Sequence, residues 1–369
     1  MKGIEKIIAS LLFVALLTGC NKQQNRFQST PTVFNDSAKI SIIRMDLDVY
    51  HLDDCITKRA RTGDYEKMVV DMPQEDSICL SRQLNEMEKK YGERYYLYLQ
   101  QLGAMAGAYN VPTTTLFYLF LSHPAYNDLY KSVEKEYTED VSDLENGFTT
   151  AFSRGTLLID GFNVPQVCTF FSGFAEYIAA DSSTIYLSLE YFLGKDFENY
   201  KYVPGIYDYM IPNLRREKIV PDAVYSWLCS EYPLQKEAGN LLDNMVQYGK
   251  MLYATQALLP DTDMKTIMGY SEEEWEWCEV NEKSMWNYLR EYNQLFSTDA
   301  KTIADYIYPA SCTKYFSDEQ HQAPSRAVLW MGLKIVSEYM EKNEKLTLTQ
   351  LLTQDVDAQQ ILQMSRYNP

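Results

Sequence analysis

Apolar residues recur every three or four positions over most of this chain, a period that restricts most of it to helices packed on a shared core. Ser271 and Glu274 form a capping box for one helix that we expect to run towards Phe296, with Tyr292 and Phe296 on its buried face. The same spacing predicts further helices over residues 113–130, 142–152, 222–230, 240–259 and 325–340, and from Ser81 onward.

Three segments, residues 40–49, 166–171 and 184–190, instead alternate apolar and polar side chains as strands do. The last two, with a turn over residues 179–183, predict a hairpin. Strands followed by helices, without βαβ alternation, indicate an α+β fold. No Pro/Gly/Ser-rich linker divides residues 39–369, so we expect one mostly helical domain with a small antiparallel sheet.

Residues 1–19 are typical of a secretory signal peptide, because Lys2 and Lys6 precede an apolar run of eleven residues. Such a run is too short to span a bilayer, which takes about 20 residues. The sequence Leu17-Thr18-Gly19-Cys20 follows and resembles the lipobox of bacterial lipoproteins. The resemblance predicts that Cys20 carries the lipid, palmitate included, and ties the protein to a membrane.

Residues 20–38 are polar and lack a clear period, so we expect a lipidated flexible tether. Asn21 follows the cysteine where an Asp is typical of inner-membrane retention, and no acidic run comes after it. We therefore expect the protein in the outer membrane of the cell envelope, lipid-anchored and facing the periplasm.

The net charge of −17, from 34 Lys and Arg against 51 Asp and Glu, opposes binding to nucleic acids. The three histidines, His51, His123 and His321, are far apart, so neighbouring residues build no His-rich metal site. Widely spaced cysteines favour buried thiols, although an oxidising compartment also permits a disulfide. These cysteines are Cys55, Cys79, Cys168, Cys229, Cys278 and Cys312.

A series of segments in a fixed order resembles the gliding motility lipoproteins called GldB. They read IIRMDLDVY, MEKKYGERYYLYL, QVCTFFSGF, YLSLEYFLGKDFENY, NLLDNMVQYGKMLY, APSRAVLWMGLKIVSEYM and DAQQILQMSRYNP. The resemblance covers nearly all of the chain after the lipobox. It implies a Bacteroidetes protein that binds or scaffolds envelope components, and a distant likeness to zincin metallopeptidases.

The sequence departs from zincins where the metal ligands belong. The helix at Pro221–Glu231 has no His, and Gln247-Tyr248-Gly249 stands where a Glu is expected. Zinc needs three or four suitably spaced donors, and the acidic pairs Asp222 with Glu231 and Asp261 with Asp263 are typical of helix ends. We therefore predict no metal, no cofactor and no catalytic residue.

If the zincin cleft is retained, we expect a binding groove lined by Tyr225, Trp227 and Tyr248. Ser172, Gly173 and Arg326 lie in segments typical of the resembled family. Arg326 begins a helix, where a cation is unfavourable unless an anion pairs with it. A carboxylate of the chain is the expected partner, and a ligand anion is the alternative.

The favoured function is therefore a non-enzymatic, membrane-anchored envelope lipoprotein. One alternative is a hydrolase that uses paired carboxylates near Asp181, Glu190 or Asp208. Another is a solute-binding lipoprotein, which needs a deep pocket between two lobes; the lack of a domain boundary opposes it.

Overall fold

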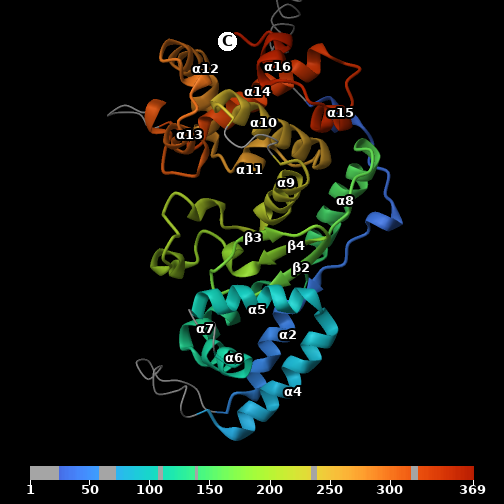
Figure 1. Ribbon diagram of the computed structural model, residues 1–369, viewed down its shortest axis with the longest axis vertical. Helices are drawn as coiled ribbons and strands as arrows, with labels where there is room; N and C mark the ends of the chain where they lie inside the picture. The colour runs from blue at the N-terminus through green and yellow to red at the C-terminus, as the bar shows by residue number, and fades with distance from the viewer. Residues whose placement is uncertain (1–24, 58–71, 107–110, 138–139, 234–238, 317–322) are drawn as a thin grey trace, which may run out of the picture.

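A computed structural model describes residues 25–57, 72–106, 111–137, 140–233, 239–316 and 323–369, with only the backbone of residues 101–106. The signal peptide and Cys20 lie outside these residues. A small sheet occupies the middle of an elongated molecule, with one group of helices at each end (Figure 1). The expected α+β fold, mostly helical with a small sheet, is confirmed.

The sheet is mixed, in the order β1-β2-β4-β3, so the expectation of an antiparallel sheet is wrong. β1 and β4 both run parallel to β2, while β3 pairs antiparallel with β4. The expected hairpin between β2 and β4 is therefore wrong; the hairpin joins β3 to β4. Every side chain of β4 is buried, as in parallel strands covered on both faces. The strands span Ile43–Arg44, Gln166–Phe170, Ile178–Ala180 and Thr184–Ser188.

The second half of the strand expected over residues 40–49 is a helix instead. Only β1 is extended, and α2 (Met45–His51) follows it directly. Met45 and Val49, four residues apart, are fully buried, and Asp46 and Asp48 place negative charge in the first turn. Negative charge stabilises a helix N-terminus, so the local sequence favours α2 over a longer strand.

Helices of the N-terminal half form the end of the molecule below the sheet in Figure 1, with α8 running along its side. Gly92 separates α4 from α5, and His123-Pro124 separates α6 from α7 as expected. The stripe that includes Leu84, Met87 and Tyr98 is buried as predicted. The helices are α4 (Gln74–Tyr91), α5 (Glu93–Ala106), α6 (Thr113–Ser122), α7 (Pro124–Tyr137) and α8 (Ser142–Leu158).

The C-terminal helices form the opposite end, where α10 and α14 pack most extensively. Gly249 and Gly332 lie at this crossing, and a Cβ on Gly332 would overlap the backbone carbonyl of Met245. The two backbones thus approach more closely than side chains would allow. The helices are α9 (Ile219–Glu231), α10 (Leu241–Leu258), α11 (Met264–Met268), α12 (Glu272–Glu291), α13 (Ala300–Ile307), α14 (Ala327–Lys342), α15 (Leu348–Thr353) and α16 (Ala358–Ser365).

Helix α12 begins with the predicted capping box but ends at Glu291 rather than near Phe296. Tyr292 and Phe296, expected in the core, are 57% and 45% exposed. Asn293 adopts a left-handed conformation that ends the helical period. Of the described helices, none combines the length and apolarity needed to cross a membrane.

Short 3-10 turns connect many of these elements. They are η1 (Arg26–Ser29), η2 (Asp36–Ala38), η3 (Leu52–Cys55), η4 (Leu189–Phe192), η5 (Glu198–Tyr202), η6 (Ile211–Asn213), η7 (Arg216–Lys218), η8 (Gln294–Phe296) and η9 (Lys314–Phe316). A disulfide between Cys55 and Cys79 joins η3 to α4. Cys168, Cys229, Cys278 and Cys312 remain thiols.

The described part of the expected tether, residues 25–38, is docked on the domain rather than extended into solvent. It contains η1 and η2, and Asn25 is 5% exposed. The guanidinium of the fully buried Arg154 on α8 donates hydrogen bonds to the carbonyl oxygens of Phe27 and Thr30. Polar composition therefore predicted the wrong state here, because the partners are supplied by distant segments.

Candidate functional site

The strand β2 ends in a sharp bend that carries Ser172 and Gly173. Gly173 and Phe174 both adopt positive φ angles, 64° and 70°. The hydroxyl and the amide N–H of Ser172 each donate to Oε1 of Glu190 at 2.7 Å. The Ser172 hydroxyl oxygen accepts from the amide of Ala175 at 3.1 Å. These bonds hold the bend against the end of β4.

Glu190 is fully buried, and its Oε2 has no hydrogen-bond partner among the described residues. Burial raises the pKa of its carboxyl, while the bonds from Ser172 act in the opposite direction. Ser172 itself is 1% exposed. The Ser172–Glu190 pair is therefore closed to solvent and suits positioning of the bend rather than attack on a substrate.

The bend leads to Tyr177, which connects the sheet to α9. Its hydroxyl donates to Oδ2 of Asp222 at 2.6 Å, and Oδ1 of Asp222 lies 2.6 Å from the ammonium of Lys218. Lys218 is 3% exposed and also donates to the carbonyl oxygens of Thr266 and Ile267 at 2.9 and 3.0 Å. The ammonium group is thus fully partnered, partly by the C-terminal end of α11.

Arg326 approaches the same end of α11. Its Nη2 donates to the carbonyl oxygen of Met268 at 3.3 Å, one residue beyond the acceptors of Lys218. Arg326 precedes α14 in a left-handed conformation, with φ of 56°. Among the described residues no carboxylate lies within ion-pair distance of it, so the expected internal ion pair is not found there.

A third cation, Arg215, lies beside Lys218. Burial lowers the pKa of the Lys218 ammonium, Asp222 opposes that effect, and the positive charges of Arg326 and Arg215 lower it further. Nε of Arg215 is buried with no hydrogen-bond partner in the part of the chain that the structure describes. We call Tyr177, Arg215, Lys218, Asp222 and Arg326 the Arg326 cluster; it holds three cations and one carboxylate.

Two of the predicted groove residues border the Arg326 cluster and one does not. Burial raises the pKa of Tyr225 well above its usual value and also raises that of Tyr248, and the charge of Arg326 acts against both shifts. Trp227 is fully buried, and its indole N–H donates to the carbonyl oxygen of Asn163 at 3.1 Å. Tyr225 and Tyr248 therefore lie close enough to Arg326 to be influenced by its charge, whereas Trp227 belongs to the core.

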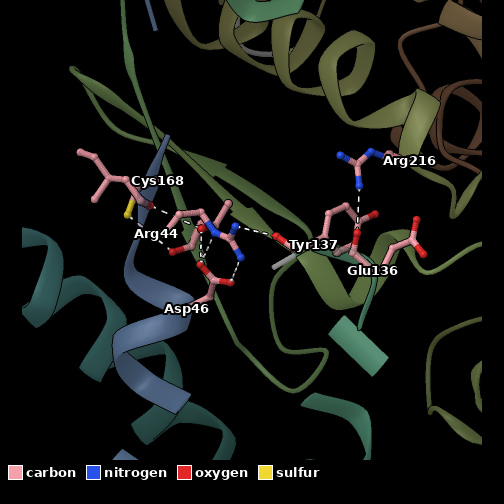
Figure 2. A network of polar contacts seen from close by, with 8 residues as sticks. Arg44, Asp46, Glu136, Tyr137, Cys168 and Arg216 are labelled. Atoms are coloured by element: carbon pink, nitrogen blue, oxygen red, sulfur yellow. Dashed lines mark hydrogen bonds and ion pairs between the residues drawn. The ribbon is translucent and has the colours of Figure 1, made fainter. Parts of the chain in front are cut away.

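A second polar network, which sequence reasoning missed, joins β1 to α7 (Figure 2). Arg44 forms two hydrogen bonds with the carboxylate of Asp46, at 2.9 and 2.7 Å, and donates to the carbonyl oxygen of Tyr137 at 2.7 Å. Asp46 is fully buried and also accepts from the hydroxyl of Thr169. The Arg-x-Asp spacing was the only local signal, because the other partners are distant in sequence.

Arg216 contacts the same segment, because it lies against the ring of Tyr137. Its guanidinium lies 4.9 Å from the centre of the Tyr137 ring and donates to the carbonyl oxygen of Glu136 at 3.1 Å (Figure 2). It also bonds both carboxylate oxygens of Asp143, at 2.9 and 2.6 Å. The hydrogen bond from Arg216 lowers the pKa of Asp143. Each arginine in this region is thus matched by a carboxylate.

Several of the acidic groups considered as catalytic residues or metal ligands serve local roles. Asp263 caps α11 by accepting from the amides of Lys265 and Thr266, and Asp222 lies in the first turn of α9. Asp181 and Glu190 lie at opposite ends of β4, so they do not form a pair. Within the described ranges no three His, Cys, Asp or Glu side chains gather closely enough to hold a metal ion.

A small pocket lies between α2, α6 and α7. The rings of Tyr50 and Tyr130 stack with their centres 3.6 Å apart, and Phe171 meets Tyr130 edge-on. Such walls favour packing of an apolar group over acid–base chemistry. The lining residues are Val49, Tyr50, Asp53, Phe120, Leu121, Tyr126, Asn127, Tyr130 and Phe171.

Among the comparisons with known proteins, only the comparison with family models gives a match. The model of the lipoprotein family described as gliding motility protein GldB matches residues 37–369, nearly the whole chain. No curated protein and no solved structure matches. The match begins two residues before the predicted start of the domain. It includes both the Arg326 cluster and the Arg44–Asp46 network, and a lipoprotein family implies association with a membrane. The chain belongs to the GldB family of gliding motility lipoproteins.

Proposed function

We propose that this protein is a non-enzymatic lipoprotein of the cell envelope that binds or scaffolds other envelope components through the Arg326 cluster. A lipid on Cys20 would hold it in the outer membrane, with the domain facing the periplasm. The GldB family match supports a motility-related lipoprotein. The Cys55–Cys79 disulfide supports export, since disulfides persist in oxidising compartments such as the periplasm.

The observation that carries the binding proposal is the excess of positive charge among the described residues of the Arg326 cluster. Among the residues that the structure describes, Arg326 makes one long hydrogen bond, although a guanidinium offers five donors. It also lies at a helix N-terminus, where positive charge is unfavourable. An oxyanion of a partner, either a carboxylate or a phosphate group, would supply what this site lacks.

The chain's overall charge makes this cluster selective. A protein with net charge −17 repels anionic partners in general. An anionic group is therefore attracted where cations outnumber carboxylates locally, and among the described residues of the cluster Arg215, Lys218 and Arg326 outnumber Asp222. The charge of Arg326 acts on Tyr225 and Tyr248, and aromatic side chains in the neighbourhood of a guanidinium suit a peptide or glycan bearing an acidic group.

The binding proposal is tested by cross-linking in envelope extracts. Wild-type lipoprotein and the Arg326→Gln variant are compared for a reproducible cross-linked partner, and Arg216→Gln is the matched control because its arginine is paired with Asp143. We expect the partner to be lost with Arg326→Gln and kept with Arg216→Gln. Equal recovery with both variants would show that the cluster is not the binding site.

Anchoring and the absence of catalysis need separate measurements. Labelled palmitate should enter the wild type and not the Cys20→Ala variant, which should leave the membrane fraction. Dialysed protein should hold no stoichiometric zinc and should not cleave a peptide library when zinc is added. Zinc-dependent cleavage that a chelator abolishes would overturn the non-enzyme assignment.

A further inference from the structure

Residues 25–32 cross the end of the domain formed by α10, α14 and α15. Arg26 donates to the carbonyl oxygens of Met340 at 2.5 Å and Asn343 at 3.1 Å, and to that of Leu346. Two of these acceptors lie at or just beyond the last turn of α14 and one precedes α15. A cation is favourable at a helix C-terminus, where carbonyl groups lack partners. Arg26 therefore holds the segment to this end specifically.

Two further sets of contacts hold the same segment. The Asn25 amide donates to the carbonyl oxygen of Tyr253 at 2.8 Å, and Gln28 reaches the carbonyl oxygen of Pro260 at 3.2 Å. Arg154 joins the segment to α10, because its Nε donates to the carbonyl oxygen of Ala257 at 2.7 Å. The segment thus contacts α8, α10 and α14 at once.

The length of chain between the lipid site and the docked segment is short. Five residue steps separate Cys20 from Asn25, and a fully extended chain spans about 3.6 Å per residue, or roughly 18 Å here. A free tether over residues 20–38 would instead average about 25 Å and reach much farther. Docking therefore removes most of the freedom that the linker length would otherwise provide.

From this geometry we propose that the docked segment, residues 25–32, clamps the domain against the bilayer with the α10–α14–α15 end facing lipid. The inference rests on the lipid at Cys20 that the proposed function includes. The sheet and then α2, α4, α6 and α7 lie progressively farther from this end (Figure 1). Arg326 begins the sixteen-residue α14 whose other end contacts Arg26, about 24 Å along the helix.

The orientation gives the molecule two functional ends. The clamped end is restricted to the membrane surface, while the Arg326 cluster and the opposite helices remain open to partners in the aqueous compartment. A partner bound at the cluster is thereby held at a defined height above the lipid, which a flexible tether would not achieve.

The test uses full-length lipoprotein in proteoliposomes of phosphatidylethanolamine and phosphatidylglycerol that contain an acceptor dye on the lipid headgroup. A donor dye is attached through an unnatural amino acid at Lys345, exposed between α14 and α15, or at Ile78, exposed on α4. We expect energy transfer several-fold stronger from position 345 than from position 78. Equal transfer from the two positions in bound protein would overturn the clamp.

Two variants separate the clamp from simple anchoring. A ten-residue Gly/Ser spacer inserted between residues 24 and 25 leaves every contact of the docked segment in place, and Arg26→Ala removes three of those contacts. We expect the transfer from position 345 to fall in both, and to remain unchanged in Arg82→Ala, which alters an exposed arginine of α4. Unchanged transfer after spacer insertion would also contradict the clamp.

Failure of the underlying anchor has a different signature. If Cys20 carries no lipid, neither the wild type nor any variant will partition into the vesicles, and Cys20→Ser will match the wild type. If the lipid is present and only the clamp is wrong, the protein will bind vesicles and the two donor positions will report the same proximity.

Discussion

The Arg44–Asp46 network and the Arg326 cluster each contain a partly buried arginine, but they differ in how its positive charge is compensated. Arg44 is matched by a buried carboxylate that is itself fully hydrogen-bonded. Within the described ranges, Arg326 has one long bond to a carbonyl and lies beside two other cations. A buried charge left without compensation costs several kcal/mol. The first arrangement therefore stabilises the fold, whereas the second, at the partly exposed Arg326, lowers stability, a cost that the proposed binding role would account for.

The largest expected effect is in the compensated network. Asp46→Ala leaves Arg44 in a protein interior without its carboxylate, so we expect unfolding free energy to fall by about 3 to 5 kcal/mol. Urea denaturation measures this change. The double variant Arg44→Met/Asp46→Leu should recover most of the loss, because it removes both charges together. A single-variant loss below about 1 kcal/mol would show that the pair is not buried as described.

The next largest loss of stability is expected when the carboxylate of the Arg326 cluster is removed. Asp222→Asn leaves Lys218 buried among like charges, and partial exposure of Asp222 limits the expected loss to about 2 to 3 kcal/mol. Inorganic phosphate should raise the melting temperature of this variant more than that of the wild type, because the anion replaces the lost charge. An equal phosphate response in both proteins would contradict an anion site, and sodium chloride at the same ionic strength is the control for screening.

A smaller effect of opposite sign is expected at Arg326 itself. Asn tolerates the left-handed backbone and is a favourable N-cap, and its introduction removes repulsion with Lys218. Arg326→Asn should therefore stabilise the protein by up to about 1 kcal/mol while abolishing the phosphate response. Loss of stability in this variant would indicate that Arg326 has a structural role. Arg216→Asn, made in the compensated region, should lose stability instead.

The sequence predicted what depends on local spacing. Helices α10 and α14 and the capping box of α12 follow from apolar periods and neighbouring residues. Tyr225 and Trp227 were assigned to one groove although residues two apart on a helix point in different directions. Tyr225 borders the Arg326 cluster, and Trp227 turns into the core.

Features that depend on distant partners were not predictable in this way. β2 and β4 pair in parallel in a sheet that is buried on both faces. One of these faces is covered by α9, which comes later in the chain, so the local sequence of the strands does not indicate it. The docking of residues 25–32 depends on Arg154 and on the C-terminal end of α14, which follows more than 300 residues later. This polar segment was therefore wrongly predicted to be a flexible tether, because its composition does not reveal the distant groups that bind it.

The smallest expected effect is pH-dependent and lies at the edge of the compensated region. Asp143 is largely exposed, so its pair with Arg216 should contribute less than about 1 kcal/mol. The hydrogen bond from Arg216 lowers the pKa of Asp143 in the folded protein below its ordinary value of 3.8. A depressed carboxyl pKa means that the unfolded chain takes up protons first as pH falls. The contribution is thus complete above the unfolded pKa and is lost as pH falls through the folded one.

Asp143→Asn should be less stable than the wild type at pH 7 and equal to it at pH 2, as measured by urea denaturation. A difference that persists unchanged at pH 2 would mean that the side chain acts through packing and not through its charge.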